Sequence, residues 1–501
     1  MKKAFFVTML ILLAAAAVLG LRSASRKTRI FGNEVFSEEA YLSFLGDEFS
    51  SLEQVKKALR PFKNLKKADL GTFAVDVTLS ESLTEEFPGV EFKYDTAAFM
   101  YGGKFNTDVT EIDLSQVTVE NTDELRRLLP YFKKVKKVTL GNNALPESER
   151  VSLCKEFPKT DFNIISIYDV LGLPVREDAV SIDLRGAALD ISVLSEKLPL
   201  FKKLETVDLR EQSIPKDTQL SLVKQFPTIE FICTVDFLGE KINSTATEID
   251  ISNKYMPGRV EEMKELLPLF KRLEKLVMCD CSLSNEEMAQ IRAQCEGIKV
   301  VWRIYMGKWS LRTDTVAFSV LIYTYNYRPL TTSDIQVLKY CTDLRALDLG
   351  HQAITDISVI GEYLTELRLL ILADNMLTDL SPLSKLEHLH YLEFFVNNVT
   401  DLSPLAECTQ LMDLNISYNH NIRDITPLLN LPKLERLWLE STAVHAEDVQ
   451  LLRTTYPDAK IVSVGRGSID QGWRTHERYY AMMDMWLNHP DSISEEFTKY
   501  D

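Results

Sequence analysis

The clearest hydrophobic pattern lies between residues 344 and 442, where apolar positions recur in short segments of the form Leu-x-x-Leu-x-Leu or a close variant. These segments begin 22 or 23 residues apart, at Leu344, Leu367, Leu389, Leu411 and Leu434. Their period-2 alternation predicts one short β-strand in each. Strands repeated at so regular an interval predict stacked coils that share a parallel sheet.

A second signal follows each strand segment. Three residues past its last apolar position stand, in order, Gln352, Asn375, Asn397, Asn419 and Thr442. A buried Asn at this point is expected to bond the backbone of neighbouring coils and close the turn after the strand. Three repeats continue with Asp-Leu-Ser-Pro-Leu or Asp-Ile-Thr-Pro-Leu, which predicts that Ser381, Ser403 or Thr426 caps a short helical turn with proline at its first position.

A longer period precedes these repeats. Pro61, Pro130, Pro199 and Pro268 are each 69 residues apart and stand in similar surroundings. Each 69-residue module predicts a strand, a helix ending at the proline, a second strand, a second helix, and a third strand that turns back as a hairpin. Examples are the strands Thr110–Leu114, Val135–Leu140 and Ile298–Tyr305, the helices Asp123–Leu129 and Val260–Leu267, and turns at Gly103, Gly172, Gly239 and Gly307.

The short coils resemble leucine-rich repeats of the internalin type. The long modules, with Leu273–Cys281 and Trp302–Trp309, are similar to exported leucine-rich repeat proteins of anaerobic bacteria. The resemblance implies an α/β solenoid (horseshoe) with a parallel concave sheet and convex helices or short turns. It also implies protein binding through the concave face, although the chain lacks a Leu-Pro-x-Thr-Gly sorting motif and its 69-residue modules depart from internalins.

Five regions follow from these patterns. We expect a signal peptide or membrane anchor at 1–29, an N-terminal cap at 30–50, long modules at 51–318, short repeats at 319–465 and a C-terminal cap and tail at 466–501. Residues 472–486 predict a helix capped by Thr475, which either covers the last coil or binds a partner. The polar residues 490–501 are expected to be loose.

The N-terminus predicts export. Met1-Lys2-Lys3 precedes the apolar run Ala4–Leu21, as in a signal sequence. The run is just long enough to span a bilayer, so either an uncleaved anchor at 4–21 or a cleaved signal fits. The chain is therefore expected outside the cytoplasm, anchored or secreted.

Charge, cysteine content and the absence of enzyme motifs limit the kinds of partner and chemistry to expect. A formal charge of −16 argues against nucleic acid, because phosphate binding needs a basic surface. Seven scattered cysteines cannot all pair within the chain and are expected to be small apolar core residues. Cys281 takes the place of the repeat Asn. The chain shows no catalytic, phosphate-binding or zinc motif, so we expect no enzyme, no cofactor and no metal; the Gly465-Arg466-Gly467 segment is too short to indicate a phosphate loop.

The candidate binding face is the concave side of the short repeats, where positions three, five and seven of each strand segment point. The residues are Leu369, Ile371, Ala373, Tyr391, Glu393, Phe395, Asp413, Asn415, Ser417, Arg436, Trp438 and Glu440. Tyr, Trp and Arg are typical of binding hot spots. The alternative is that these aromatic residues contact the C-terminal cap or are incidental.

Other charged positions have simpler explanations. Asp113, Asp183 and Asp250 share one phase, but lie three coils, or roughly 14 Å, apart, which is too far to share an ion. Lys63, Lys133, Lys202 and Lys271 follow the first helix of each module, where a cation complements the helix dipole. The sequence therefore predicts a non-enzymatic protein-binding scaffold; a binder of cell-wall polymer or carbohydrate, or a structural envelope protein, is the alternative.

Overall fold

The computed structural model describes residues 27–30, 33–45, 48–320 and 328–498. Backbone contacts divide them into two compact units. One comprises the described residues up to Gln212 together with Gln225–Phe231, and the other comprises Ser213–Lys224 and the described residues from Ile232 onward. Most of the predicted signal or anchor segment lies outside the described residues. No helix that the structure describes is long and apolar enough to cross a membrane.

The first unit opens with a hairpin and a four-stranded sheet. Strands β1 (Lys27–Ile30) and β2 (Asn33–Phe36) pair antiparallel. Strand β3 (Tyr41–Ser43) is the first parallel strand of the sheet β3-β4-β5-β6. The other elements of this part are α1 (Leu52–Leu59), β4 (Lys67–Asp76), α2 (Glu81–Glu86), β5 (Glu91–Met100) and β6 (Gly103–Asn106).

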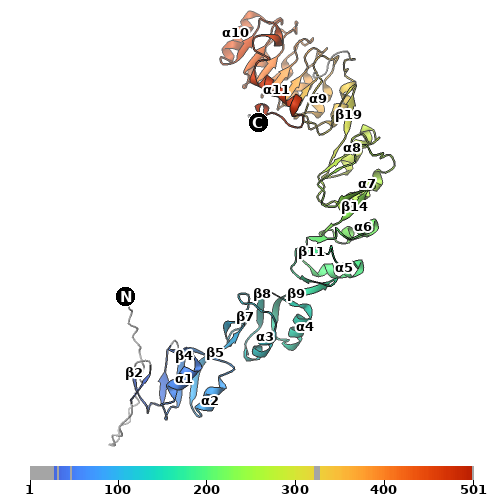
Figure 1. Cartoon of the computed structure of the whole chain (residues 1–501). Helices are drawn as coiled ribbons and strands as arrows, with labels where there is room; N and C mark the ends of the chain where they lie inside the picture. The colour runs from blue at the N-terminus through green and yellow to red at the C-terminus, as the bar shows by residue number, and fades with distance from the viewer. Residues whose placement is uncertain (1–26, 31–32, 46–47, 321–327, 499–501) are drawn as a thin grey trace. The chain divides into compact units, whose positions relative to one another are not determined.

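The next modules repeat this order, as predicted (Figure 1). Their strands are β7 (Glu111–Asp113), β8 (Lys137–Pro146), β9 (Asp161–Val170), β10 (Leu173–Arg176), β11 (Ser181–Asp183), β12 (Thr206–Asp208), β13 (Glu230–Ile232), β14 (Thr234–Phe237), β15 (Glu240–Asn243), β16 (Glu248–Asp250), β17 (Lys275–Val277), β18 (Lys299–Val301), β19 (Arg303–Met306) and β20 (Trp309–Arg312). Their helices are α3 (Asp123–Leu128), α4 (Glu147–Glu156), α5 (Ile191–Lys197), α6 (Lys216–Gln225), α7 (Val260–Leu266) and α8 (Asn285–Gln294). The 3-10 turns η1 (Leu129–Tyr131), η2 (Leu198–Leu200) and η3 (Leu267–Leu269) hold the periodic prolines.

The predicted hairpins are present. β5 pairs antiparallel with β6, β9 with β10, β14 with β15, and β19 with β20. Gly172 and Gly239 have φ of 84° and 93°, a conformation that glycine adopts without strain. One detail differs from prediction, because Ile298–Tyr305 is not one strand: β18 ends at Val301 and β19 starts at Arg303.

The horseshoe is confirmed only in part. Repeats, parallel strands and helices between them are present, but the parallel strands of the long modules lie in separate sheets of three or four strands. β6 and β10 pair antiparallel at the edge of their sheets, where the next parallel strand would pair, and the hairpins β14-β15 and β19-β20 form separate two-stranded sheets. Among the described residues, one continuous parallel sheet of more than four strands therefore exists only in the short repeats.

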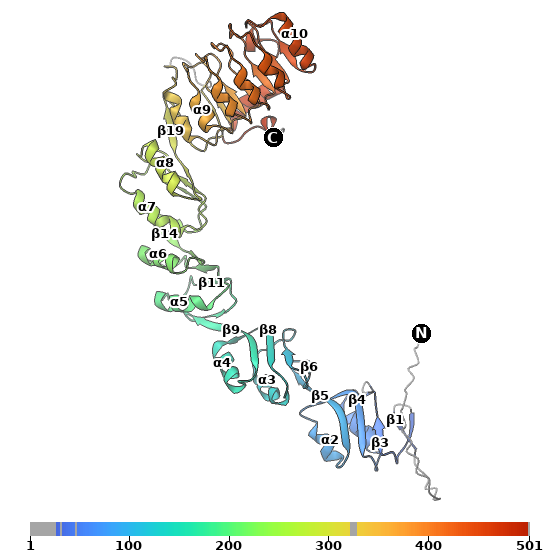
Figure 2. The same cartoon turned by 180° about the vertical axis from the view of Figure 1, so that it is seen from behind.

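The short repeats form a seven-stranded parallel sheet in sequence order (Figure 2). Its strands are β21 (Ala317–Ser319), β22 (Ala346–Asp348), β23 (Leu369–Ile371), β24 (Tyr391–Glu393), β25 (Asp413–Asn415), β26 (Arg436–Trp438) and β27 (Lys460–Val462). Opposite the strands lie η5 (Asp334–Tyr340), α9 (Ser358–Tyr363), η6 (Ser381–Lys385), η7 (Ser403–Glu407), η8 (Thr426–Asn430) and α10 (Ala446–Thr455).

Buried asparagines close the turns after β23, β24 and β25, as predicted. The Asn397 side chain donates from Nδ2 to the carbonyls of Leu372 and Phe394, both at 3.0 Å, and accepts from the Leu377 amide at 2.8 Å. Val396, just before it, has a φ of 55°, so the chain turns sharply here. Cys281 also fills this role, because its Sγ lies 3.2 Å from the Ile251 carbonyl.

The predicted caps of the short helical turns are wrong in one respect. Ser381 begins η6, but its amide donates to Asp379 Oδ1 at 2.8 Å, and the Ser403 and Thr426 amides do the same to Asp401 and Asp424. The carboxylate two residues upstream therefore caps each turn. An aspartate accepts more strongly than a hydroxyl, which explains the exchange of roles.

The chain beyond β27 is ordered. It contains η9 (Gly467–Ile469), α11 (Glu477–Asn488) and η10 (Glu495–Phe497). The N-cap of α11 is His476, whose ring accepts from the Arg478 amide, rather than Thr475. The prediction of a loose tail is wrong for residues 490–498, because Phe497 is only 1% exposed.

Replacing Asn397 with alanine tests the asparagine turns. We expect Asn397→Ala to lower the free energy of unfolding by about 2–4 kcal/mol, because it leaves buried backbone groups without partners. Chemical denaturation measures the change. Asn398 is exposed and serves as the matched control, so Asn398→Ala should shift it by less than about 0.5 kcal/mol. Equal effects at both positions would contradict the role given to Asn397.

Candidate functional site

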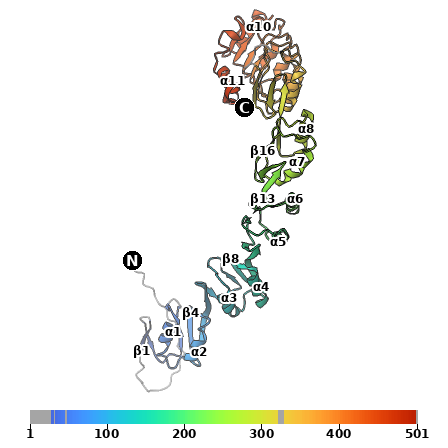
Figure 3. The same cartoon turned by 45° about the vertical axis from the view of Figure 1, so that its right-hand side comes forward.

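The predicted concave face lies beneath the chain's own C-terminal part. We call residues 466–498 the covering segment; it packs against the concave side of the sheet, and its helix α11 contacts β21 and reaches β25 through Arg478 (Figure 3). All ten residues put forward as the core of the binding face are at most 8% exposed: Leu369, Ile371, Tyr391, Glu393, Phe395, Asp413, Asn415, Arg436, Trp438 and Glu440. The alternative that these side chains contact a C-terminal cap thus describes the structure, and partner binding through them would require the segment to leave.

Apolar side chains form one part of this contact. The segment contributes Trp473, Met482, Met485, Trp486 and Phe497 to one buried cluster with the sheet. The sheet side of the cluster comprises Ala317, Ala346, Leu369, Ile371, Ala373, Tyr391, Phe395, Trp438 and Val462. The concave positions form a second core on the opposite side of the sheet from the repeat leucines, which the sequence analysis gave only as an alternative.

Trp473 links the apolar and polar parts of the contact. Its ring lies 5.0 Å from that of Trp438 and 5.5 Å from that of Tyr391, measured between centroids. Its indole Nε1 donates to Glu393 Oε1 at 2.7 Å. The Tyr391 hydroxyl donates to the same oxygen. Glu393 thus accepts two hydrogen bonds, and burial raises its pKa.

A buried group of three charges joins the segment to β25 and β26. Asp413 is fully buried and accepts from Arg436 Nε at 2.7 Å and Nη2 at 2.6 Å. Arg478 of α11 donates to the same carboxylate from Nε and Nη2, both at 2.8 Å. Arg478 also reaches Glu435, at 2.6 Å from Nη2. Charge-assisted pairs of this geometry are strong when buried.

A further buried acid lies at the other end of the face. Burial raises the pKa of Asp348 to about 6, although the Ser319 hydroxyl and the Gly350 amide donate to it. Nearby Glu393 raises it further, and His351 opposes the shift. The Glu440 carboxyl, two strands from Glu393, also has a pKa raised by burial. The covered face is therefore rich in acids that resist ionisation.

Part of the covered face is left without hydrogen bonds. Asn415 Nδ2, Trp438 Nε1 and Glu440 Oε1 are buried and have no partner among the described residues. Asn415 and Trp438 are register partners on β25 and β26, and Glu440 is two residues further along. Gly465 packs so closely here that a Cβ on it would lie 2.7 Å from Glu440 Oε1. The Gly465-Arg466-Gly467 segment thus serves close packing rather than phosphate binding.

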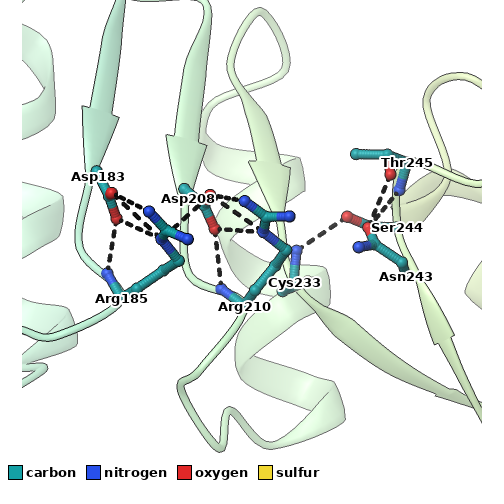
Figure 4. A network of polar contacts seen from close by, with 8 residues as sticks. All are labelled: Asp183, Arg185, Asp208, Arg210, Cys233, Asn243, Ser244 and Thr245. Atoms are coloured by element: carbon teal, nitrogen blue, oxygen red, sulfur yellow. Dashed lines mark hydrogen bonds and ion pairs between the residues drawn. The ribbon is translucent and has the colours of Figure 1, made fainter.

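The concave positions of the long modules are open and charged in the first unit. Arg185 donates to Asp183 Oδ2 at 2.7 Å, and Arg210 to Asp208 Oδ2 at 2.6 Å (Figure 4). Arg185 Nε also lies 3.7 Å from Asp208 Oδ2, which joins the two pairs. Pairing with Arg185 lowers the pKa of Asp183 to about 2. Both arginines are exposed, so these charges are available to a partner.

The described residues show neither a metal site nor a reactive cysteine pair. Within the described residues, no three His, Cys, Asp or Glu side chains are grouped so that they could hold a metal ion. The seven cysteines are free, and all but Cys154 are buried. Burial raises the pKa of Cys233 to about 11, so its thiol stays protonated at neutral pH.

Trp473 and Arg478 are the residues that sequence reasoning missed. The apolar side of the helix at 472–486 was visible as Tyr479, Met482, Met483 and Trp486. Nothing in that pattern showed how far along the sheet the helix would run. The observable signal was the apolar character of Leu369, Ile371 and Ala373 at concave positions, which in an open face would be exposed.

The comparisons with known proteins agree on the repeat. Residues 365–407 match the family of leucine-rich repeats (two copies). A comparison with curated proteins finds no match.

Solved structures that resemble the chain include two internalins and another leucine-rich repeat protein. Internalin C2 from Listeria monocytogenes is 27% identical, covers 26% of this chain and 65% of its own, and gives a TM-score of 0.22. The internalin InlF from the same organism is 18% identical over 72% and 84% of the two chains, with a TM-score of 0.27. A leucine-rich repeat protein of Leptospira interrogans is 15% identical over 81% and 91%, with a TM-score of 0.23. The predicted leucine-rich repeats are confirmed by the family match over residues 365–407.

The raised pKa of Asp348 predicts how stability varies with pH. Between pH 3.8 and about 6 the folded chain binds more protons at this site than the unfolded chain, so its contribution to the free energy of unfolding falls as pH rises. Asp348→Asn keeps an acceptor for Gly350 and removes the titration. We expect the variant to be more stable than the parent at pH 7 by roughly 1–3 kcal/mol, with the gain disappearing near pH 4.

Denaturation between pH 4 and 7 measures this difference. Asp379→Asn is the control with the opposite sign, because the bonds from Ser381 lower the pKa of Asp379 and stabilise the folded state above its unfolded pKa. The Asp379→Asn variant should be less stable than the parent at pH 7, and this difference in the free energy of unfolding should shrink as the pH falls. If the free energies of unfolding of the parent and Asp348→Asn change in parallel with pH, the pKa of Asp348 is not raised.

Proposed function

We propose that this leucine-rich repeat chain is a non-enzymatic, extracytoplasmic scaffold that binds another protein through the concave side of its repeats. The observation that carries the proposal is the regular series of coils, which turns successive strand positions toward one side of each sheet. Leucine-rich repeat proteins commonly bind other proteins, and no enzyme family is indicated by the repeat match.

The open concave positions of the long modules are the first candidate surface. Asp183, Arg185, Asp208 and Arg210 present alternating charge on neighbouring strands. Alternating charge favours a partner with complementary charges, because such contacts fix register and raise the association rate. Arginine is also enriched where binding energy concentrates.

The alternative of carbohydrate or cell-wall polymer binding has less support. It relied on Tyr391, Phe395 and Trp438 as stacking platforms, and the covering segment occupies their exposed side. Sugar rings cannot stack there while the segment is in place. We therefore favour a protein partner.

A location outside the cytoplasm rests on the Met1–Leu21 pattern. Alkaline phosphatase becomes active only after export, so its fusion behind residues 1–29 should show activity in intact bacteria. Replacing Leu12 and Leu13 with arginine in the same fusion should abolish the activity by breaking the apolar run. An inactive parent fusion would contradict the proposed location.

Charge reversal tests the open surface. The double variant Arg185→Glu, Arg210→Glu places four acidic side chains together and should weaken binding of a captured envelope protein by about tenfold or more. Crosslinking pulldown followed by surface plasmon resonance of the captured protein measures this loss. The matched control is Lys155→Glu, Lys159→Glu, two exposed lysines in and after α4. Equal binding by both variants would move the binding surface elsewhere.

A further inference from the structure

The covering segment occupies the face in the way that a bound helix would. It contributes no strand to the seven-stranded sheet, whose strands all lie between Ala317 and Val462. The Pro490 carbonyl of the segment accepts from the Ala317 amide of β21 at 2.9 Å, so leaving the sheet would break this bond but no strand pairing. Its helix α11 is amphipathic, with Met482, Met485 and Trp486 buried against the sheet and Tyr480 and Leu487 exposed.

The charges beneath the segment remain balanced when the segment is absent. Asp413 keeps its two hydrogen bonds from Arg436 in that case, at 2.7 and 2.6 Å. Glu435, the other partner of Arg478, is about half exposed and can be hydrated. Removing Arg478 therefore leaves no isolated buried charge, which is the usual reason that breaking a buried ion pair is costly.

The segment also leaves three buried polar atoms of the face without hydrogen bonds. Asn415 Nδ2 and Trp438 Nε1 are donors, and Glu440 Oε1 is an acceptor; all three are buried without partners among the described residues. A buried polar atom without a partner costs free energy. A different occupant that offers a carbonyl oxygen to the two donors would bind this part of the face better than the segment does.

We propose that the covering segment is a displaceable internal ligand, and that its place is taken by an amphipathic helix of another protein that carries an arginine in its first turn and is preceded by an aromatic residue. This rests on the proposed protein-binding function and adds its partner class. The arginine pairs with Asp413, and the aromatic side chain packs between Tyr391 and Trp438, as Arg478 and Trp473 do now. The acids Asp348, Glu393 and Glu440 further favour a partner that brings donors or positive charge.

Competition from the tethered segment determines how tightly an external helix must bind to replace it. A segment joined to β27 by a short connection competes at an effective concentration on the order of millimolar. An external helix therefore binds only to the fraction of chains whose segment is released. Weakening the segment without disturbing the sheet should raise that fraction and the apparent affinity together.

A labelled peptide of residues 466–498, added to the full chain, tests the exchange by fluorescence anisotropy. We expect the Arg478→Ala chain to bind it at least about tenfold more tightly than the parent chain does. Arg466→Ala, at an exposed position of the same segment, is the matched control and should bind like the parent. A second peptide with Arg478→Glu should fail to bind any chain, because it places a carboxylate against Asp413.

Several results would overturn the proposal. Equal affinity of the parent and Arg478→Ala chains would show that the segment does not control access, provided that amide exchange confirms folded β24–β26. Equal binding of the Arg478→Glu peptide would show that the contact is nonspecific. A dimer of the Arg478→Ala chain without peptide, detected by sedimentation, would assign the face to the segment of a second copy rather than to another protein.

The outcome is separable from that of the proposed function. The peptide is supplied, so its binding does not depend on finding a natural partner. The Arg185→Glu, Arg210→Glu chain keeps the covered face and should bind the peptide as its parent does. A natural partner that uses the covered face should be released by excess unlabelled peptide, whereas one that survives this competition would contradict the partner class proposed here.

Discussion

A parallel sheet with apolar side chains on both faces has to be covered on both faces. In the short repeats, the repeat leucines fill one side, and Leu369, Ile371 and Tyr391 stand on the other. Helices and turns between the strands can cover only the first side, because each connects neighbouring strands there. The chain beyond the last strand supplies the second cover, and the fold of residues 466–498 follows from this requirement.

The same requirement explains why the long modules differ. In the first unit, their concave positions carry Asp183, Arg185 and Asp208, which are paired and at least partly solvated rather than fully buried. Such a face needs no cover. The chain thus combines exposed charged strands with one strongly apolar sheet, and the difference arises from alternate residues of strands that are otherwise similar. Recognition through the charged strands needs no rearrangement, whereas recognition through the apolar sheet depends on release of the covering segment.

Sequence patterns predicted local structure well and long-range packing poorly. The strands after Leu367 and Leu389, the buried Asn397 and the hairpin at Gly172 follow from residues close together in the chain, and the structure confirms them. The caps failed because aspartate and serine compete for the same amide, and spacing alone does not decide between them.

The contact of Trp473 with Glu393 spans 80 residues and has no periodic signal. The candidate binding residues were therefore located correctly on the sheet, but their burial could not be read from the strands that carry them. Whether they also bind a partner depends on how easily the segment opens.

Amide hydrogen exchange on the full chain measures that opening most directly. If the segment is a displaceable ligand, the amides of α11 should exchange through a shared opening that leaves β24–β26 protected, and should do so markedly faster than those strands. Exchange of α11 and the strands at one common rate would show that they unfold only together. In that case the segment would be a permanent part of the core, and the central claim would be contradicted.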